Sequence, residues 1–115
     1  MAERTDILRI LFICTQNMLR SPTGEQIYTG VEGIEARSAG ISPDAIEVIT
    51  VDLLLWADKI FVMEERHRLF LEQSFADAVV AKEIICLGIP DIYDHMDSAL
   101  VRLLRERVAP HLGQL

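Results

Sequence analysis

A cysteine and an arginine six positions apart are the residues of this chain best suited to chemistry. Cys14 ends the apolar run 8–14, and Arg20 stands directly before Ser21 and Pro22. Serine is a favourable N-cap and proline suits the first helical position, so the pattern predicts a strand, a tight loop and a helix capped by Ser21. Such a loop directs several backbone N–H groups at one anion, and the positive end of the helix dipole lies at the same point.

The chemistry predicted for this loop is nucleophilic attack on a bound phosphoryl group. A helix N-terminus and the guanidinium of Arg20 both favour the thiolate form of Cys14, which is the reactive form. Arg20 also offers a planar fork of donors that matches two phosphoryl oxygens, which lysine does not. Asn17 stands in the loop, and asparagine tolerates the left-handed conformation that a tight loop requires. The competing interpretation is a buried strand-end cysteine beside an unrelated surface arginine.

The rest of the sequence predicts the elements that must position this loop. Apolar runs alternate with helical patterns, which is typical of a parallel sheet covered by helices on both faces. We expect strands at residues 8–14, 34–39, 59–63 and 83–89, with the second at an edge because it is less apolar. Helices are expected at residues 22–30, from Ser42-Pro43-Asp44 through Leu54, at 64–77 and at 97–108. The predicted fold class is α/β with three layers and a four-stranded parallel sheet.

A carboxylate is expected at the same edge of the sheet as Cys14. Asp91 follows the fourth expected strand, and open α/β sheets bind ligands at the carboxyl ends of their strands. Such a carboxylate can protonate a leaving oxygen and then deprotonate water. Asp94 is a rival for this role, whereas Asp97 is better explained as a helix cap. Tyr93 lies between the two rivals, either against an aryl leaving group or as a loop residue with a solvated hydroxyl.

The composition restricts the class of protein. With 115 residues, half of them hydrophobic, we expect one domain over residues 1–115. Two distant cysteines form no metal-ligand cluster or disulfide framework, so we predict no metal or cofactor and a reducing, cytoplasmic location. The formal charge of −7 disfavours nucleic acid and anionic membrane surfaces as partners. We identify no secretory signal or transmembrane stretch.

Four segments of the chain together resemble the low-molecular-weight protein tyrosine phosphatase family. They are residues 14–22, 38–40, 57–63 and 91–93, which come in the family's order. The resemblance implies a small α/β fold of the phosphotyrosine protein phosphatase I type. It also implies hydrolysis of phosphate monoesters through a cysteinyl-phosphate intermediate, without metal. The implied substrate is a phosphorylated protein or a small aryl phosphate.

The resemblance also assigns roles to residues by position. It favours Asp91 over Asp94 as the general acid, because Tyr93 then falls two residues after the acid, as in the family. The implied catalytic residues are the nucleophile Cys14, the phosphate clamp Arg20 and the acid Asp91. The implied substrate-binding residues are Thr15, Gln16, Asn17, Met18, Leu19, Ser21 and Tyr93, with Asn17 and Ser21 as a pair that stabilises the loop.

The chain departs from the family pattern at several positions. Gln16 replaces the usual glycine, and Leu19 stands where a second cysteine is common. Ile92 replaces the proline that usually follows the acid. The segment at residues 41–56 is short, and residues 41–51 contain no aromatic side chain to wall the pocket. The sequence therefore gives phosphotyrosine recognition less support than phosphatase chemistry.

Three other functions are compatible with a cysteine in an anion loop. An arsenate reductase typically needs two further cysteines, and only Cys86 is available. A phosphoryl carrier has less need of Arg20 and of an acid that completes hydrolysis, so a stable cysteinyl phosphate would distinguish it. A non-catalytic module would bind phosphoproteins without turnover.

The three histidines show no shared metal-ligand spacing, and we assign none of them a catalytic role. The sequence does not indicate an oligomeric state.

Overall fold

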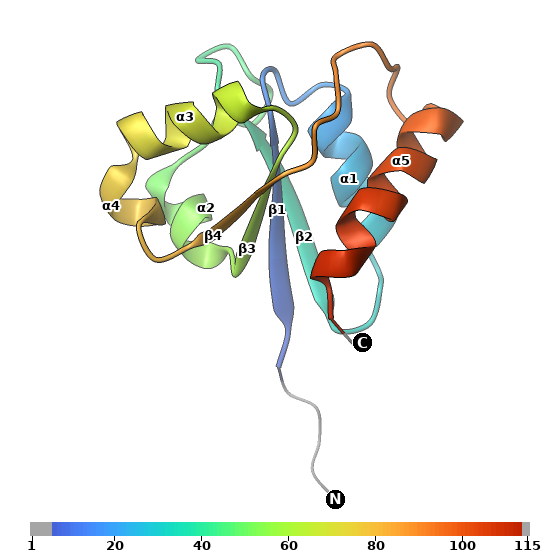
Figure 1. Ribbon diagram of the computed structural model, residues 1–115, viewed down its shortest axis with the longest axis horizontal. Coiled ribbons are helices and arrows are strands. Elements are labelled where there is room, and N and C mark those ends of the chain that lie inside the picture. The colour runs from blue at the N-terminus through green and yellow to red at the C-terminus, as the bar shows by residue number, and fades with distance from the viewer. Residues whose placement is uncertain (1–5, 114–115) are drawn as a thin grey trace, which may run out of the picture.

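The computed structural model describes residues 6–113, which form a three-layer α/β fold (Figure 1). Four parallel strands form one sheet in the order β2-β1-β3-β4, so β2 lies at an edge as predicted. The strands are β1 (Leu8–Cys14), β2 (Ile34–Gly40), β3 (Lys59–Val62) and β4 (Glu83–Cys86). The helices are α1 (Arg20–Tyr28), α2 (Val51–Trp56), α3 (Glu65–Ser74), α4 (Ala76–Val79) and α5 (Ser98–Val108), followed by a 3-10 turn at Ala109–His111. The predicted fold class is confirmed.

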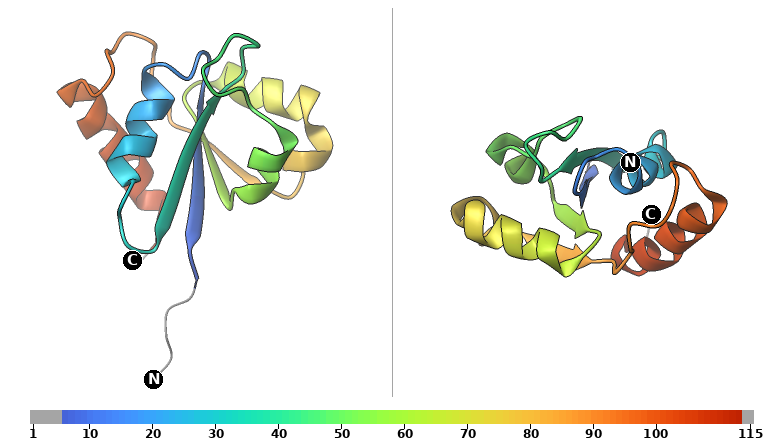
Figure 2. Two further views of the ribbon diagram at one scale, coloured as in Figure 1. Left: turned by 180° about the vertical axis from the view of Figure 1, so that it is seen from behind. Right: turned by 90° about the horizontal axis from the view of Figure 1, so that it is seen from above.

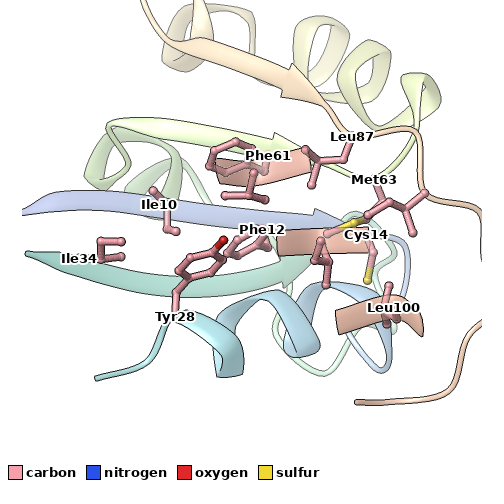
Figure 3. Packing of buried hydrophobic residues seen from close by; sticks show 12 residues of the cluster. Ile10, Phe12, Cys14, Tyr28, Ile34, Phe61, Met63, Leu87 and Leu100 are labelled. Atoms are coloured by element: carbon pink, nitrogen blue, oxygen red, sulfur yellow. The ribbon is translucent and has the colours of Figure 1, made fainter. Parts of the chain in front are cut away.

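The side chains of β1 divide the core into two clusters, one on each face of the sheet. Ile10, Phe12 and Cys14 pack on the side of α1 and α5, while Leu11 and Ile13 pack on the side of α2, α3 and α4. Figure 2 shows these two groups of helices on opposite sides of the sheet. Burying each such apolar side chain stabilises the fold by about 1.5–3 kcal/mol. A central strand buried on both faces therefore holds Cys14 at a fixed place at its end (Figure 3).

All four strands end at the same edge of the sheet, the upper edge in Figure 1. The chain after β4 remains paired beyond the strand itself. The N–H groups of Leu87 and Ile89 donate to the carbonyls of Val62 and Met63, both at 2.8 Å. This extended pairing agrees with the strand predicted to residue 89, and it brings Asp91 to the edge where β1 ends.

The helix predicted from Ser42 does not form, and that expectation is wrong. The chain turns at residues 43–44, and Val48 forms a parallel bridge with Gly40 at the end of β2. The β-branched run at residues 48–51 favours such an extended backbone over a helix. A helix begins only at α2, where the hydroxyl of Thr50 accepts a hydrogen bond from the Leu53 N–H at 3.1 Å.

The other helices differ from the prediction mainly at their ends. The helix predicted at residues 64–77 is broken at Phe75 into α3 and α4. The predicted cap of the last helix is confirmed, because Asp97 Oδ1 accepts a hydrogen bond from the Ala99 N–H at 2.8 Å. Among residues 6–113, no helix has the length and apolar character needed to cross a membrane.

Candidate active site

The loop at residues 15–19 joins β1 to α1 and has the backbone of an anion-binding loop. Asn17 adopts the predicted left-handed conformation, with φ of 56°. The backbone N–H groups of residues 15–19 donate no hydrogen bond to any other residue from 6 to 113. Consecutive unpaired N–H groups at the N-terminus of a helix form a concave site that favours an anion.

Gly40 lets the end of β2 lie directly against this loop. A Cβ atom at position 40 would stand 2.5 Å from the Thr15 carbonyl oxygen and 2.9 Å from the Asn17 backbone nitrogen. Both distances are shorter than any side chain tolerates, so only glycine fits here. The Ser42 N–H also donates to the Thr15 carbonyl at 3.0 Å, which fixes the loop from the same side.

A buried hydrogen-bond network connects the loop to the thiol. The Asn17 side-chain amide donates to the hydroxyls of Ser21 and Ser38, both at 2.9 Å, and Ser38 in turn donates to the Glu25 carboxylate. The Ser21 Oγ lies 2.9 Å from the Cys14 Sγ. The Ser21 hydroxyl also lies 3.4 Å from the Ala39 carbonyl oxygen, but a thiolate can only accept, so the Ser21 proton points at the nearer sulfur once Cys14 is ionised.

Ser21 is therefore not the helix cap that the sequence predicted. Helix α1 begins at Arg20 with Leu19 in the cap position, and Ser21 lies inside the first turn. A serine hydroxyl at the start of a helix can form a hydrogen bond with the backbone or with a neighbouring side chain, and here it contacts the Cys14 thiol. The predicted Asn17–Ser21 pair is present as a direct hydrogen bond.

Arg20 is buried, with 2% of its side chain exposed, and its guanidinium is held from one edge. The Nη1 atom donates to the Glu64 carboxylate and, at 2.8 Å, to the Ile89 carbonyl. The Nε atom lies 3.6 Å from Asp91 Oδ1. Within residues 6–113, Nη2 makes no hydrogen bond, so the Nε and Nη2 edge remains for an anion. A guanidinium anchored in this way needs little reorganisation to bind two oxygens of a phosphoryl group.

Glu64, directly after β3, lies between two guanidinium groups. Its carboxylate accepts a hydrogen bond from Arg20 and another from the Nε of Arg66 at 3.0 Å. The hydrogen bond from Arg66, together with Arg20, lowers the pKa of Glu64 to about 2 against the effect of burial. Glu64 is therefore ionised at neutral pH and holds both arginines.

His67 connects helix α3 to the loop. Its Nδ1 accepts a hydrogen bond from the Glu64 backbone N–H at 3.0 Å, and its Nε2 lies 3.0 Å from Thr15 Oγ1. Burial, together with the charges of Arg66 and Arg20, lowers the pKa of His67 to about 4. The imidazole is thus neutral at pH 7, with its proton on Nε2 and donated to Thr15.

The sequence interpretation missed the contribution of α3 to this site. Glu64, Arg66 and His67 were given no role, although Glu64 and His67 have the three-residue spacing of a helix-capping pair directly after a buried strand. That spacing places both at the carboxyl edge of the sheet. The contact with Thr15 lies about fifty positions away in the chain, so no local pattern indicates it.

The structure brings Asp91, rather than Asp94, to Arg20. Asp91 is 59% exposed and faces the guanidinium, whereas Asp94 is an exposed residue whose backbone carbonyl accepts a hydrogen bond from the Asp97 N–H at 3.1 Å. Tyr93 is half-buried against the core cluster that contains Cys14. The remaining predicted substrate-binding residues lie in the loop itself, with Gln16 and Met18 exposed and Thr15 and Leu19 partly buried.

The fold and this loop define a small α/β protein with a candidate anion site after its first strand. No protein-family model and no curated protein matches the chain. Among solved structures it is similar to SP-PTP, a low molecular weight protein tyrosine phosphatase from Streptococcus pyogenes, with a TM-score of 0.76 and 17% identity over 95% of this chain and 93% of that one.

Two further solved structures show the same similarity. The tyrosine phosphatase Wzb from Escherichia coli, in complex with phosphate, has a TM-score of 0.73 and 24% identity over 93% of this chain and 99% of that one. The YwlE arginine phosphatase from Geobacillus stearothermophilus has a TM-score of 0.69 and 21% identity over 91% of this chain and 92% of that one. At these identities the similarity establishes the fold, and it confirms at that level the resemblance to low-molecular-weight protein tyrosine phosphatases.

Proposed function

We propose that this chain is a phosphate monoester hydrolase that acts through a cysteinyl-phosphate intermediate. The observation that carries the proposal is the convergence of Cys14, Arg20 and Asp91 on one loop with unpaired backbone N–H groups. Cys14 and Arg20 come from the first fifth of the chain and Asp91 from its last quarter, and only the fold brings them together. Structurally similar proteins that are named phosphatases add support.

The first step forms the intermediate. The Cys14 thiolate attacks phosphorus, so an S–P bond forms while the ester P–O bond breaks. Asp91 gives its proton to the leaving oxygen, which departs as an alcohol or phenol. Arg20 and the N–H groups of the loop stabilise the charge on the non-bridging oxygens.

The second step returns the enzyme to its starting state. Water attacks the phosphorus, and the Asp91 carboxylate takes the proton that this water loses. The S–P bond breaks, and Cys14 leaves as a thiolate that receives the Ser21 hydrogen bond. Inorganic phosphate is released, and Asp91 is again protonated for the next cycle. All proton transfers in this cycle use Asp91, and none needs a metal or cofactor.

We propose a phosphorylated tyrosine of a protein, or a small aryl phosphate, as the substrate. Two of the similar structures described above are named tyrosine phosphatases, and Tyr93 packs against the core cluster that contains Cys14. One similar structure is named an arginine phosphatase, so phosphoarginine is the alternative to test. A reduced Cys14 is required for turnover, which agrees with the cytoplasmic location that we propose.

The experiment is steady-state hydrolysis of 4-nitrophenyl phosphate, without added metal, by the wild type and three variants. We expect Cys14→Ser to abolish turnover and Asp91→Asn to lower kcat by about ten- to ten-thousand-fold. Asp94→Asn is the matched control and should stay within about twofold of the wild type. Phosphotyrosine and phosphoarginine peptides measured in parallel identify the preferred substrate class.

Three results would overturn this proposal. Undiminished turnover by Cys14→Ser excludes the cysteinyl phosphate. A larger loss from Asp94→Asn than from Asp91→Asn reassigns the acid. No turnover by the wild type, with inorganic phosphate still bound, favours the non-catalytic binding module or the phosphoryl carrier instead.

A further inference from the structure

The hydroxyl of Thr15, next to the proposed nucleophile, has a proton that no described residue accepts. Its oxygen accepts a hydrogen bond from Arg66 Nη2 at 2.8 Å and another from His67 Nε2 at 3.0 Å. Both partners are donors, because the imidazole proton lies on Nε2. Two accepted hydrogen bonds fill the lone pairs of a hydroxyl oxygen, so the proton of Thr15 points in a third direction.

Arg66 presents a fixed cation beside the same hydroxyl. Its Nε donates to Glu64 Oε1 at 3.0 Å and its Nη2 contacts Thr15, which together hold the guanidinium plane. The side chain is 53% exposed, and Nη1 donates to no residue from 6 to 113. The pKa of Arg66 is raised mainly by its hydrogen bond to Glu64, and the charges of Asp91 and Cys14 raise it further. The guanidinium thus lies within electrostatic reach of both proposed reacting groups.

At this place two guanidinium groups, those of Arg20 and Arg66, contact a single carboxylate, that of Glu64. Glu64 carries one negative charge, and it is shared between Arg20 and Arg66. Arg20 is buried and faces the proposed phosphoryl site, whereas the side chain of Arg66 is exposed to solvent. An exposed, immobilised guanidinium in a chain with a formal charge of −7 is a selective point of attraction for an anionic group.

We propose that the Thr15 hydroxyl and the Arg66 guanidinium form a second oxyanion subsite, which takes a carboxylate carried by the leaving group of the substrate. This inference rests on the proposed function and narrows its substrate class to phosphate monoesters with a second negative group near the ester. A carboxylate accepts a hydrogen bond from the hydroxyl through one oxygen and from Nη1 of Arg66 through the other. Residues 41–51 contain no aromatic side chain that could pack against the leaving group, so recognition of the substrate by its charge is consistent with this segment.

The test compares phenyl phosphate with 3-carboxyphenyl phosphate, which differ only in the second anion. The wild type should show a kcat/KM about tenfold higher for the carboxylated ester, mainly through a lower KM, and raised salt should reduce this preference. Arg66→Gln should remove the preference and Thr15→Val should reduce it, whatever their rates on phenyl phosphate, while Arg66→Lys retains part of it. Arg102→Gln, an exposed arginine of α5, is the matched control and should keep the full preference.

Dissociation constants for phenylphosphonate and 3-carboxyphenylphosphonate, which are not hydrolysed, give the same ratio without turnover. A wild type that hydrolyses phenyl phosphate but shows no preference in either assay overturns the subsite and leaves the proposed function intact. Equal losses on both esters in Arg66→Gln also overturn it, because Arg66 would then act on the phosphoryl site alone. If neither ester is hydrolysed, the proposed function fails, and the phosphonate ratio still decides the subsite.

Discussion

Two hydrogen-bond networks hold the anion loop, and they differ in charge. The first, the neutral network, lies within α1 and β2 and contacts the Cys14 sulfur. The second, the charged network, comes from the start of α3 and holds Arg20. The neutral network consists of Asn17, Ser21 and Ser38 and ends at the Glu25 carboxylate. The charged network consists of Thr15, Arg20, Glu64, Arg66 and His67.

The difference follows from where each network lies. Asn17 and Ser21 are buried beside Cys14 and are uncharged, whereas the buried guanidinium of Arg20 is compensated by the Glu64 carboxylate. Each buried side-chain nitrogen and oxygen that the structure describes has a partner, so this polarity is satisfied. The charged network reaches solvent through Arg66, where forming an ion pair requires little desolvation. We therefore expect changes in the neutral network to affect chemistry and changes in the charged network to affect binding.

The largest effect is expected at Gly40, which touches the loop that both networks hold. In Gly40→Ala the added methyl group would collide with the Thr15 carbonyl and the Asn17 backbone, so the loop must move. Displacement of a reacting group by about 1 Å costs about a hundredfold in rate, and overpacking costs about 1–3 kcal/mol of stability. Aryl phosphate turnover and thermal unfolding measure the two effects. Activity within twofold of the wild type would show that the loop tolerates this displacement.

Glu64→Gln should have the next largest effect, because it removes the carboxylate between two arginines. Arg20 then loses the partner that fixes its Nη1 edge. Loss of one charge-assisted hydrogen bond corresponds to about a thirtyfold decrease in kcat/KM, which we expect chiefly as a higher KM. Binding of inorganic phosphate should weaken in parallel. A decrease confined to kcat, with phosphate binding unchanged, would contradict the division between the two networks.

Ser21→Ala should have a smaller effect of a different kind. It removes the hydroxyl that donates to the Cys14 sulfur, so the thiolate forms less readily and leaves less readily. We expect kcat to fall about tenfold and the acid limb of kcat/KM to move to higher pH, with KM little changed. The pH profile distinguishes this from a structural loss, which lowers the rate equally at every pH. Ser98→Ala, an exposed serine of α5, serves as the control.

A fourth effect concerns stability alone, and it is expected from the charged network as the pH falls. The unfolded chain takes up a proton at His67 near pH 6.5, whereas the folded protein does so only near pH 4. Stability is thus lost between these values, by about 3 kcal/mol, and Glu64 causes a further loss between pH 4.5 and about 2. Thermal unfolding of the wild type and His67→Gln checks this. Identical pH profiles from 7 to 4 would show that His67 is not linked to folding.

The strand, the loop and the positions of Cys14 and Arg20 were predictable because their signals are local. A continuous apolar run fixes β1, and the left-handed Asn17 and the buried Arg20 fall within seven residues of its end. The edge position of β2 also follows from its lower apolar content. Asp91 was predictable because parallel strands end at one edge, so its place depends on topology more than on local sequence.

The errors arose where distant contacts override local preference. Ser42-Pro43-Asp44 has the pattern of a helix start, but pairing of the following residues with Gly40 draws the chain into an extended path. Ser21 has the pattern of a cap, but Asn17 and Cys14 engage its hydroxyl. The link between His67 and Thr15 joins segments far apart in the chain and has no local signal.

Transfer of a phosphoryl group to Cys14 is tested directly by measuring the mass of the cysteinyl-phosphate intermediate. Asp91→Asn is the variant to use with 4-nitrophenyl phosphate. This leaving group departs without protonation, whereas attack by water still needs the carboxylate, so the intermediate accumulates. After rapid quenching, we expect the mass of one phosphoryl group on the peptide that contains Cys14. Continued turnover with no phosphoryl adduct, or an adduct on another residue such as Cys86, would contradict it.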